Sequence, residues 1–110
     1  MTIEVVVINK DNGGFSLWIN DDQPFHVHRF KTLMEELKIE RIERVRESFG
    51  PAEIVDNIHT AHGVFGLHME FDEFAGTTIY SEDGELMEKI LELMIQSGDY
   101  RRKKSSRPIR

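Results

Sequence analysis

The chain has 110 residues, of which 39% are hydrophobic, with seven Phe, no Cys and a formal net charge of −6. This length and apolar content predict one packed domain rather than a disordered chain, and the lack of Cys excludes disulfides, a thiolate nucleophile and cysteine zinc sites. No apolar run reaches the roughly 20 residues of a membrane-spanning helix, and Met1–Ile8 lacks the basic start of a signal peptide, so we expect a cytoplasmic protein with no membrane attachment.

Two β-prone runs open the chain. Ile3–Asn9 is rich in β-branched residues and ends at a loop over residues 10–14 that contains two glycines, while Phe15–Asn20 alternates apolar and polar side chains. The two runs predict a β-hairpin. A turn signal over residues 20–24 follows, and Phe25–Arg29 is expected to form a third short strand.

A helix is predicted to begin near Leu33, because Thr32 and Glu35 have the spacing of a capping box. We favour a continuous helix as far as Phe49, since apolar residues recur at near-helical spacing between these positions. The stretch over residues 38–48 is so charged that only a narrow stripe of such a helix could be buried. A helix that ends near Lys38, followed by a solvent-facing edge strand over residues 39–48, is the alternative, and Gly50-Pro51 ends the segment in either case.

The middle of the chain predicts three further extended segments. Ala52–Ile58 is expected to be a strand or an extended loop. Val64–Phe71 is the clearest strand, with Phe65, Leu67, Met69 and Phe71 on one face. The turn over residues 72–76 should bring Thr77–Tyr80 back as its antiparallel neighbour.

A second helix is predicted to start at Asp83 or at Ser81 and to end at Gly98, a favourable residue after a helix C-terminus. Its apolar stripe is Leu86, Met87, Ile90, Leu91, Leu93 and Met94. Residues 1–100 are therefore predicted to form one α+β domain, an antiparallel sheet with two helices packed on it in the order β-β-β-α-(β)-β-β-α. The basic residues 101–110 are expected to be a disordered tail.

The charges of the chain are segregated. Six of its fourteen cations lie in the last ten residues, which contain no acid, so eight cations face all twenty acids in residues 1–100, a balance of −12. Between Glu70 and Asp99, nine carboxylates face one cation, Lys89. Such a balance favours a positively charged partner and disfavours nucleic acid as the main partner.

We predict that the acidic run forms a partner-binding surface. Its residues are Glu70, Asp72, Glu73, Glu82, Asp83, Glu85, Glu88 and Glu92. A solvated helix face beside a polar turn would look the same in sequence, but such a face usually mixes the two signs of charge. Trp18, Phe74 and Tyr80 are candidates for the aromatic anchors of this interface, although burial in the core is the simpler expectation for Trp18.

Histidines offer a second kind of site. His26 and His28 would project from one face of a strand and could hold a divalent metal ion together with a carboxylate such as Asp56 or Glu70. His59, His62 and His68 complete the set of five. An H-x-H spacing recurs by chance on strands, so ordinary hydrogen-bonded histidines are the expected outcome, with no metal or other cofactor.

The chain contains no motif of an enzyme active site. A G-x-S-x-G elbow, a P-loop and a G-x-G-x-x-G loop are all absent from the sequence, and twenty acids make a close carboxylate pair uninformative. We therefore expect that the protein is not an enzyme.

The segment Phe71–Asp83, which leads into an acidic amphipathic helix, resembles the endings of small bacterial immunity proteins. These proteins neutralise the toxin domains of polymorphic-toxin and contact-dependent growth inhibition systems. The resemblance covers residues 71–97 together with the size, acidity and α+β order of the chain. It implies a cytoplasmic inhibitor that binds a cognate toxin domain, often a basic nuclease, and carries over no individual functional residue.

The leading hypothesis is thus an immunity-type binding protein that uses its acidic surface. A metal-binding module or small metal-dependent enzyme that uses His26 and His28 is the alternative. A small accessory domain that assembles through an edge strand or an apolar patch is a third hypothesis. The oligomeric state is left open.

Overall fold

A computed structural model describes residues 3–11, 13–20, 27–50, 52–71 and 76–103, with the side chains of all of these except Val27 and His28. The elements follow one another as β1 (Ile3–Asn9), β2 (Phe15–Asn20), α1 (Val27–Met34), a 3-10 turn η1 (Glu35–Leu37), β3 (Ile39–Phe49), β4 (Ala52–Thr60), β5 (Gly63–Glu70), β6 (Gly76–Tyr80), α2 (Gly84–Gln96) and β7 (Tyr100–Lys103). The predicted α+β class is confirmed.

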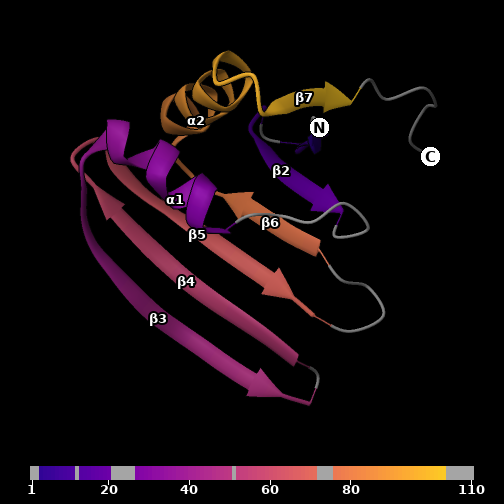
Figure 1. The fold of residues 1–110 in the computed structure, drawn as a ribbon, viewed down its shortest axis with the longest axis vertical. Coiled ribbons are helices and arrows are strands. Elements are labelled where there is room, and N and C mark those ends of the chain that lie inside the picture. Colours follow the sequence, from indigo (N-terminus) through magenta and orange to yellow (C-terminus); the bar gives the residue numbers. More distant parts are fainter. Residues whose placement is uncertain (1–2, 12, 21–26, 51, 72–75, 104–110) are drawn as a thin grey trace.

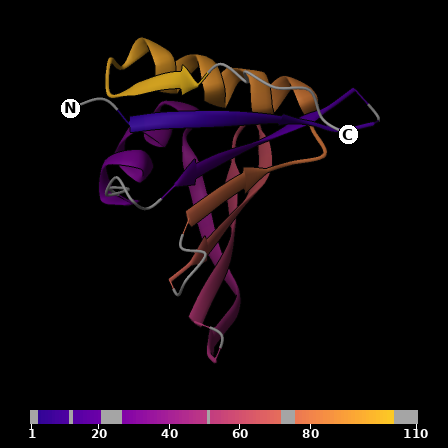
Figure 2. The ribbon, with the colours of Figure 1, turned by 90° about the vertical axis from the view of Figure 1, so that its right-hand side faces the viewer.

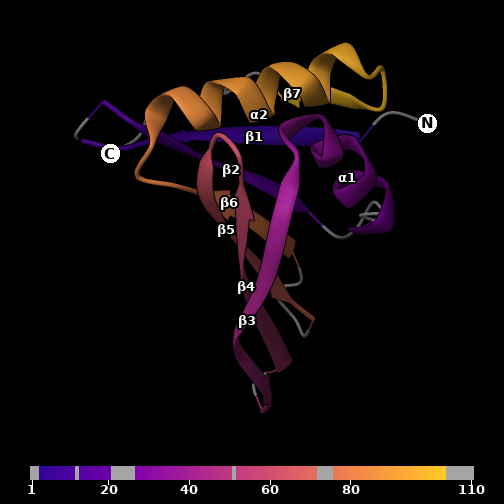
Figure 3. The same cartoon turned by 90° about the vertical axis from the view of Figure 1, so that its left-hand side faces the viewer.

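One seven-stranded sheet, with the order β3-β4-β5-β6-β2-β1-β7, contains all of these strands (Figure 1). Neighbouring strands are antiparallel except β1 and β7, which run parallel. The sheet is strongly twisted: α2 lies along β1 at one end, while the hairpin of β3 and β4 projects away from both helices at the other (Figures 2 and 3). We call the face covered by the helices the helix face, and the opposite one the back face.

Both helices contribute to one hydrophobic core on the helix face. A row of register partners crosses the sheet there, from Val7 through Leu17 and Ile79 to Leu67. Phe30 of α1 meets Phe65 of β5 edge to face, with ring centroids 6.1 Å apart. Beyond Leu67, the same row continues into Asp56 and Arg44, so the apolar core ends at β4.

The predicted start of the first helix is wrong. Residues 27–29 lie in α1 rather than in a third strand, and Phe25 and His26 lie outside the described residues. Thr32 is an exposed residue inside the helix, so its match to a capping box is coincidental. The apolar periodicity begins at Phe30 and continues through Met34 to Leu37, the three residues with which this segment enters the core.

The favoured continuous helix over residues 33–49 is also wrong, and the alternative of an edge strand is confirmed. Lys38 has a left-handed backbone, with φ 60° and ψ 76°, and ends the helical segment. The charged residues that follow are stabilised by partners on β4, among them Asp56 for Arg44 and Glu53 for Arg46. A helix would have exposed these charges without the cross-strand partners.

The predicted hairpin of β1 and β2, the strand at Ala52–Ile58 and the pairing of β5 with β6 are confirmed. Phe65, Leu67 and Met69 of β5 face the core as expected. Phe71 does not: it follows the last residue of β5 and its surface is 51% exposed.

The predictions for α2 are confirmed at both ends, whereas those for the tail are wrong in part. Asp83 is the N-cap residue, and Gly98 has the positive φ of 83° expected just after a helix. Arg101–Lys103, expected to be disordered, belong to β7, which is anchored by the buried Tyr100 and pairs with β1. Residues 104–110 lie outside the described residues.

Candidate functional site

The N-terminus of α2 is fixed by a short hydrogen-bonded turn. The Ser81 hydroxyl donates to the carbonyl oxygen of Val64 at 2.7 Å and accepts the Asp83 N–H at 3.1 Å. Asp83 Oδ1 in turn accepts the N–H of Leu86 at 3.1 Å, as an N-cap residue does. The Asp83 carboxylate therefore caps the helix in addition to contributing a negative charge.

The outer face of α2 carries exposed carboxylates. Its inner residues Leu86, Met87, Ile90 and Met94 are buried. Five acids of this region are exposed: Glu82 and the N-cap residue Asp83 just before the helix, and Glu85, Glu88 and Glu92 within it. We call Glu82, Glu85, Glu88 and Glu92, which do not have the capping role of Asp83, the α2 acidic face. The carboxylates nearest the helix N-terminus are favoured there by the helix dipole.

The α2 acidic face has no ion pair within the part of the chain that the structure describes. The ion pairs that the structure does describe use the acids Glu4, Glu43, Glu47, Glu53, Asp56 and Asp99. Three of the six acids on β3, β4 and β5 thus have an arginine partner, whereas the acids of the α2 acidic face have none among the described residues.

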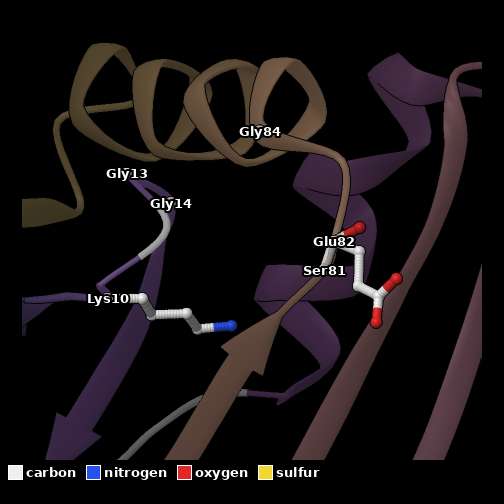
Figure 4. A pocket seen from close by; sticks show the side chains of 6 residues that line it. All are labelled: Lys10, Gly13, Gly14, Ser81, Glu82 and Gly84. Atoms are coloured by element: carbon white, nitrogen blue, oxygen red, sulfur yellow. The ribbon is translucent and has the colours of Figure 1, made fainter.

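Two pockets flank this face. One, of about 580 Å³, lies between the β1–β2 loop and the start of α2 and is lined by Lys10, Gly13, Gly14, Ser81, Glu82 and Gly84. Figure 4 shows the Lys10 side chain extending into it, while the Glu82 carboxylate points away from Lys10. The other pocket, of about 470 Å³, brings Arg102 of β7 to the same wall as Glu88 and Glu92. Each pocket therefore places one cation near the face, Lys10 at its N-terminal end and Arg102 at its C-terminal half.

The structure divides the predicted acidic surface. Glu70 ends β5, six residues from Val64, and a strand of that length places it roughly 20 Å from the Ser81 turn. Asp72 and Glu73 lie outside the described residues. The remaining predicted residues, Glu82, Asp83, Glu85, Glu88 and Glu92, lie together.

The most unusual charged group is Asp56, which the sequence suggested only as a possible carboxylate beside the histidines. Asp56 is 0% exposed on the helix face, where its Oδ1 accepts a 2.5 Å hydrogen bond from Arg44 Nε. Its Oδ2 has no hydrogen-bond partner among the described residues and lies 4.0 Å from Lys31 Nζ of α1. The hydrogen bond to Asp56 and its negative charge raise the pKa of the Arg44 guanidinium. No local sequence signal predicts this cluster, because its members come from three elements.

The three histidines whose side chains the structure describes do not gather into one site. His68 lies 2.7 Å from Glu53 and His59 lies 3.1 Å from Glu43, both on the back face. His62 is exposed in the β4–β5 turn. No group of three or more metal-binding side chains occurs within the described ranges.

The prediction of a metal site at His26 and His28 assumed that both residues lie on one strand. The backbone of His28 is helical, so this assumption is wrong for His28, and His26 lies outside the described residues.

Two of the three aromatic residues proposed as anchors, Trp18 and Tyr80, lie on the back face, away from α2. Trp18 and Tyr80 are half-buried there, each packed over a glycine of the neighbouring strand, Gly76 and Gly66 respectively. Trp18 is therefore not a core residue. Phe74 lies outside the described residues.

Comparison with protein-family models, with curated proteins and with solved structures gave no match for this chain. Among the helices of the described segments, none has the length and apolar character needed to span a bilayer.

Proposed function

We propose that this chain is a non-enzymatic binding protein of the immunity type, which neutralises a basic toxin domain through the α2 acidic face. The observation that carries the proposal is the contrast between two charged regions. Glu47, Glu53 and Asp56 of β3 and β4 each form an ion pair with an arginine, whereas Glu82, Glu85, Glu88 and Glu92 are exposed and form no ion pair within the described chain. Acids that contribute to no internal pair remain available to a partner.

The physical role of such a face is to attract and orient a cationic surface. Four carboxylates, one just before α2 and three along it, set up a local negative potential, which speeds the encounter with a basic partner and weakens as salt screens it. A nuclease groove that binds phosphates is a suitable partner, because carboxylates on α2 can occupy the positions of the phosphates.

The test is a binding measurement with a basic toxin domain; where the gene beside this chain encodes a large secreted protein, its C-terminal domain is the one to use. The double reversal Glu85→Lys with Glu88→Lys should lower the association rate about tenfold or more at low salt. The neutral pair Glu85→Gln with Glu88→Gln should have a smaller effect in the same direction. The matched control is Glu35→Lys with Glu36→Lys, two exposed acids of η1.

Folding of each variant is checked by circular dichroism, because a lysine near a helix N-terminus opposes the dipole. Loss of binding in the α2 reversal with binding retained in the η1 control supports the proposal. Equal binding by all variants, or an affinity that does not change with salt, contradicts it.

A further inference from the structure

The open edge of the sheet at β3 carries an inference that is independent of α2. β3 has 11 residues and ends the strand order, so only β4 pairs with it within the described chain. The opposite edge, β7, has only four residues. A long open edge presents a row of unpaired N–H and C=O groups to any other strand.

The side chains of β3 leave apolar surface at this edge. Ile42 is 43% exposed, Val45 is 54% exposed and Phe49 is 89% exposed, the highest value among the exposed large apolar residues that the structure describes. Proteins usually protect such an edge with charges, and β3 has them. The order of these charges decides whether they repel a second strand or select one.

The order is self-complementary in one antiparallel register. When Ile42 lies opposite Ile42 of a second copy, Arg41 lies opposite Glu43 and Glu43 opposite Arg41. The segment over residues 41–44 has regular pairing with β4, between two register shifts, so Arg41 and Glu43 share the back face as this register requires. Opposite charges in direct cross-strand positions stabilise a strand pair, and like charges destabilise it.

Neighbouring registers do not have this property. A slide of two residues in one direction, which moves the two-fold axis to residue 43, sets Glu43 against its own copy, and the same slide in the other direction sets Arg41 against its own copy. Parallel in-register pairing opposes every charge to itself. The edge therefore discriminates among partners and registers, which a merely protective set of charges would not do.

The two charged groups are already held at the back face. Glu43 Oε1 lies 3.1 Å from His59 Nε2, and Arg41 Nη2 lies 3.2 Å from the same nitrogen. His59 is on β4, so both side chains are positioned by the neighbouring strand while they remain exposed.

We propose that the partner of β3 is a second copy of this chain, paired antiparallel about Ile42 so that the two sheets become continuous. The dimer has a two-fold axis through Ile42, and each copy supplies Arg41 to the other's Glu43. The α2 acidic face lies near the other end of the sheet, so each copy can still present it (Figure 1).

The test uses the full chain in sedimentation equilibrium at concentrations up to about 200 µM, because dimer formation follows mass action. We expect a monomer–dimer equilibrium for the wild type. Arg41→Glu alone opposes two acids at each contact and Glu43→Arg alone opposes two cations, so each variant should be monomeric. An equimolar mixture of the two variants restores both opposite-charge contacts and should form a heterodimer. Glu36→Arg, a charge change away from β3, should dimerise like the wild type.

The double variant Arg41→Glu with Glu43→Arg, which restores the pairs within one chain, should also dimerise. If a single variant fails to fold, the wild type and this double variant still test the proposal, because both are expected to dimerise. A wild type that stays monomeric at the highest concentration, or single variants that still dimerise, would overturn the proposal. So would a mixture of two folded single variants that stays monomeric.

Discussion

Tyr80 packs over Gly66, its register partner on the neighbouring strand, and fills the space that a side chain at residue 66 would need. A Cβ atom built on Gly66 would lie 2.6 Å from the Tyr80 hydroxyl oxygen and closer still to the ring. Trp18 and Gly76 form a second pair of this kind, with 2.8 Å between such a Cβ and Trp18 Nε1. The two aromatic rings thereby cover the back face of the sheet, where the described structure has no helix.

Gly66→Ala should therefore destabilise the protein by about 2 kcal/mol, because the Tyr80 ring must leave its position. The free energy of unfolding in urea measures this cost. In a Tyr80→Ala background the same change should cost much less. Gly84→Ala is the matched control: a Cβ there meets no atom within 4 Å, and alanine favours the helix. An equal cost of Gly66→Ala in both backgrounds would show that the ring is not the cause.

The buried carboxylate of Asp56 predicts that the loss of stability on removing Arg44 depends on whether the Asp56 charge is present. Arg44→Met leaves Asp56 buried without its hydrogen-bond donor, so the Tm should fall by roughly 5–10 °C. In an Asp56→Asn background the carboxylate charge is absent, and Arg44→Met should lower the Tm by much less. Scanning calorimetry of the four chains completes the double-mutant cycle. A Tm change that is the same in both backgrounds would contradict the role assigned to this pair.

Tyr100 predicts a loss of stability at high pH. Burial raises the pKa of its phenol to about 12, the charge of Asp99 adds to the rise, and Arg29 opposes it. In the unfolded chain the phenol ionises near its ordinary pKa of about 10. The unfolded state therefore loses this proton first, and the free energy of unfolding should decline as pH rises from about 10 to 12.

Tyr100→Phe removes this contribution, so the difference in stability between wild type and variant should change across that pH range and stay constant below it. The variant also removes a buried hydroxyl that has no hydrogen-bond partner among the described residues. At neutral pH it should therefore be as stable as the wild type, or more stable by about 1 kcal/mol. A difference that does not vary with pH would contradict the raised pKa.

Asp83 allows the capping role to be separated from the charge. Asp83→Ala should cost about 1 kcal/mol, and Asp83→Asn only a small part of that, because asparagine also accepts the Leu86 N–H. Chemical denaturation gives these values. If the proposed partner contacts the exposed glutamates, Asp83→Asn should weaken binding less than Glu85→Lys. The opposite ranking would place the contact at the cap itself.

Several features of this protein were determined by local sequence. The β1–β2 hairpin, the buried face of β5 and the start of α2 at Asp83 were all predicted, because each depends on residues a few positions apart. The acidity of the outer face of α2 was also predictable, since helical periodicity alone places Glu85, Glu88 and Glu92 there.

Only the tertiary structure decided the rest. β3 has near-helical apolar spacing, but Arg44 and Arg46 form ion pairs with the carboxylates of Asp56 and Glu53 on β4, which no local window contains. Arg101 lies 2.7 Å from Glu4, a partner 97 residues away, and the pairing of β7 with β1 places this basic segment in the sheet. Glu70 and Glu82 belong to one acidic run in sequence yet lie at opposite ends of the β5–β6 hairpin. The physical reason is the same in each case: cross-strand hydrogen bonds and ion pairs join residues that are distant in the chain, and their free energy outweighs local propensity.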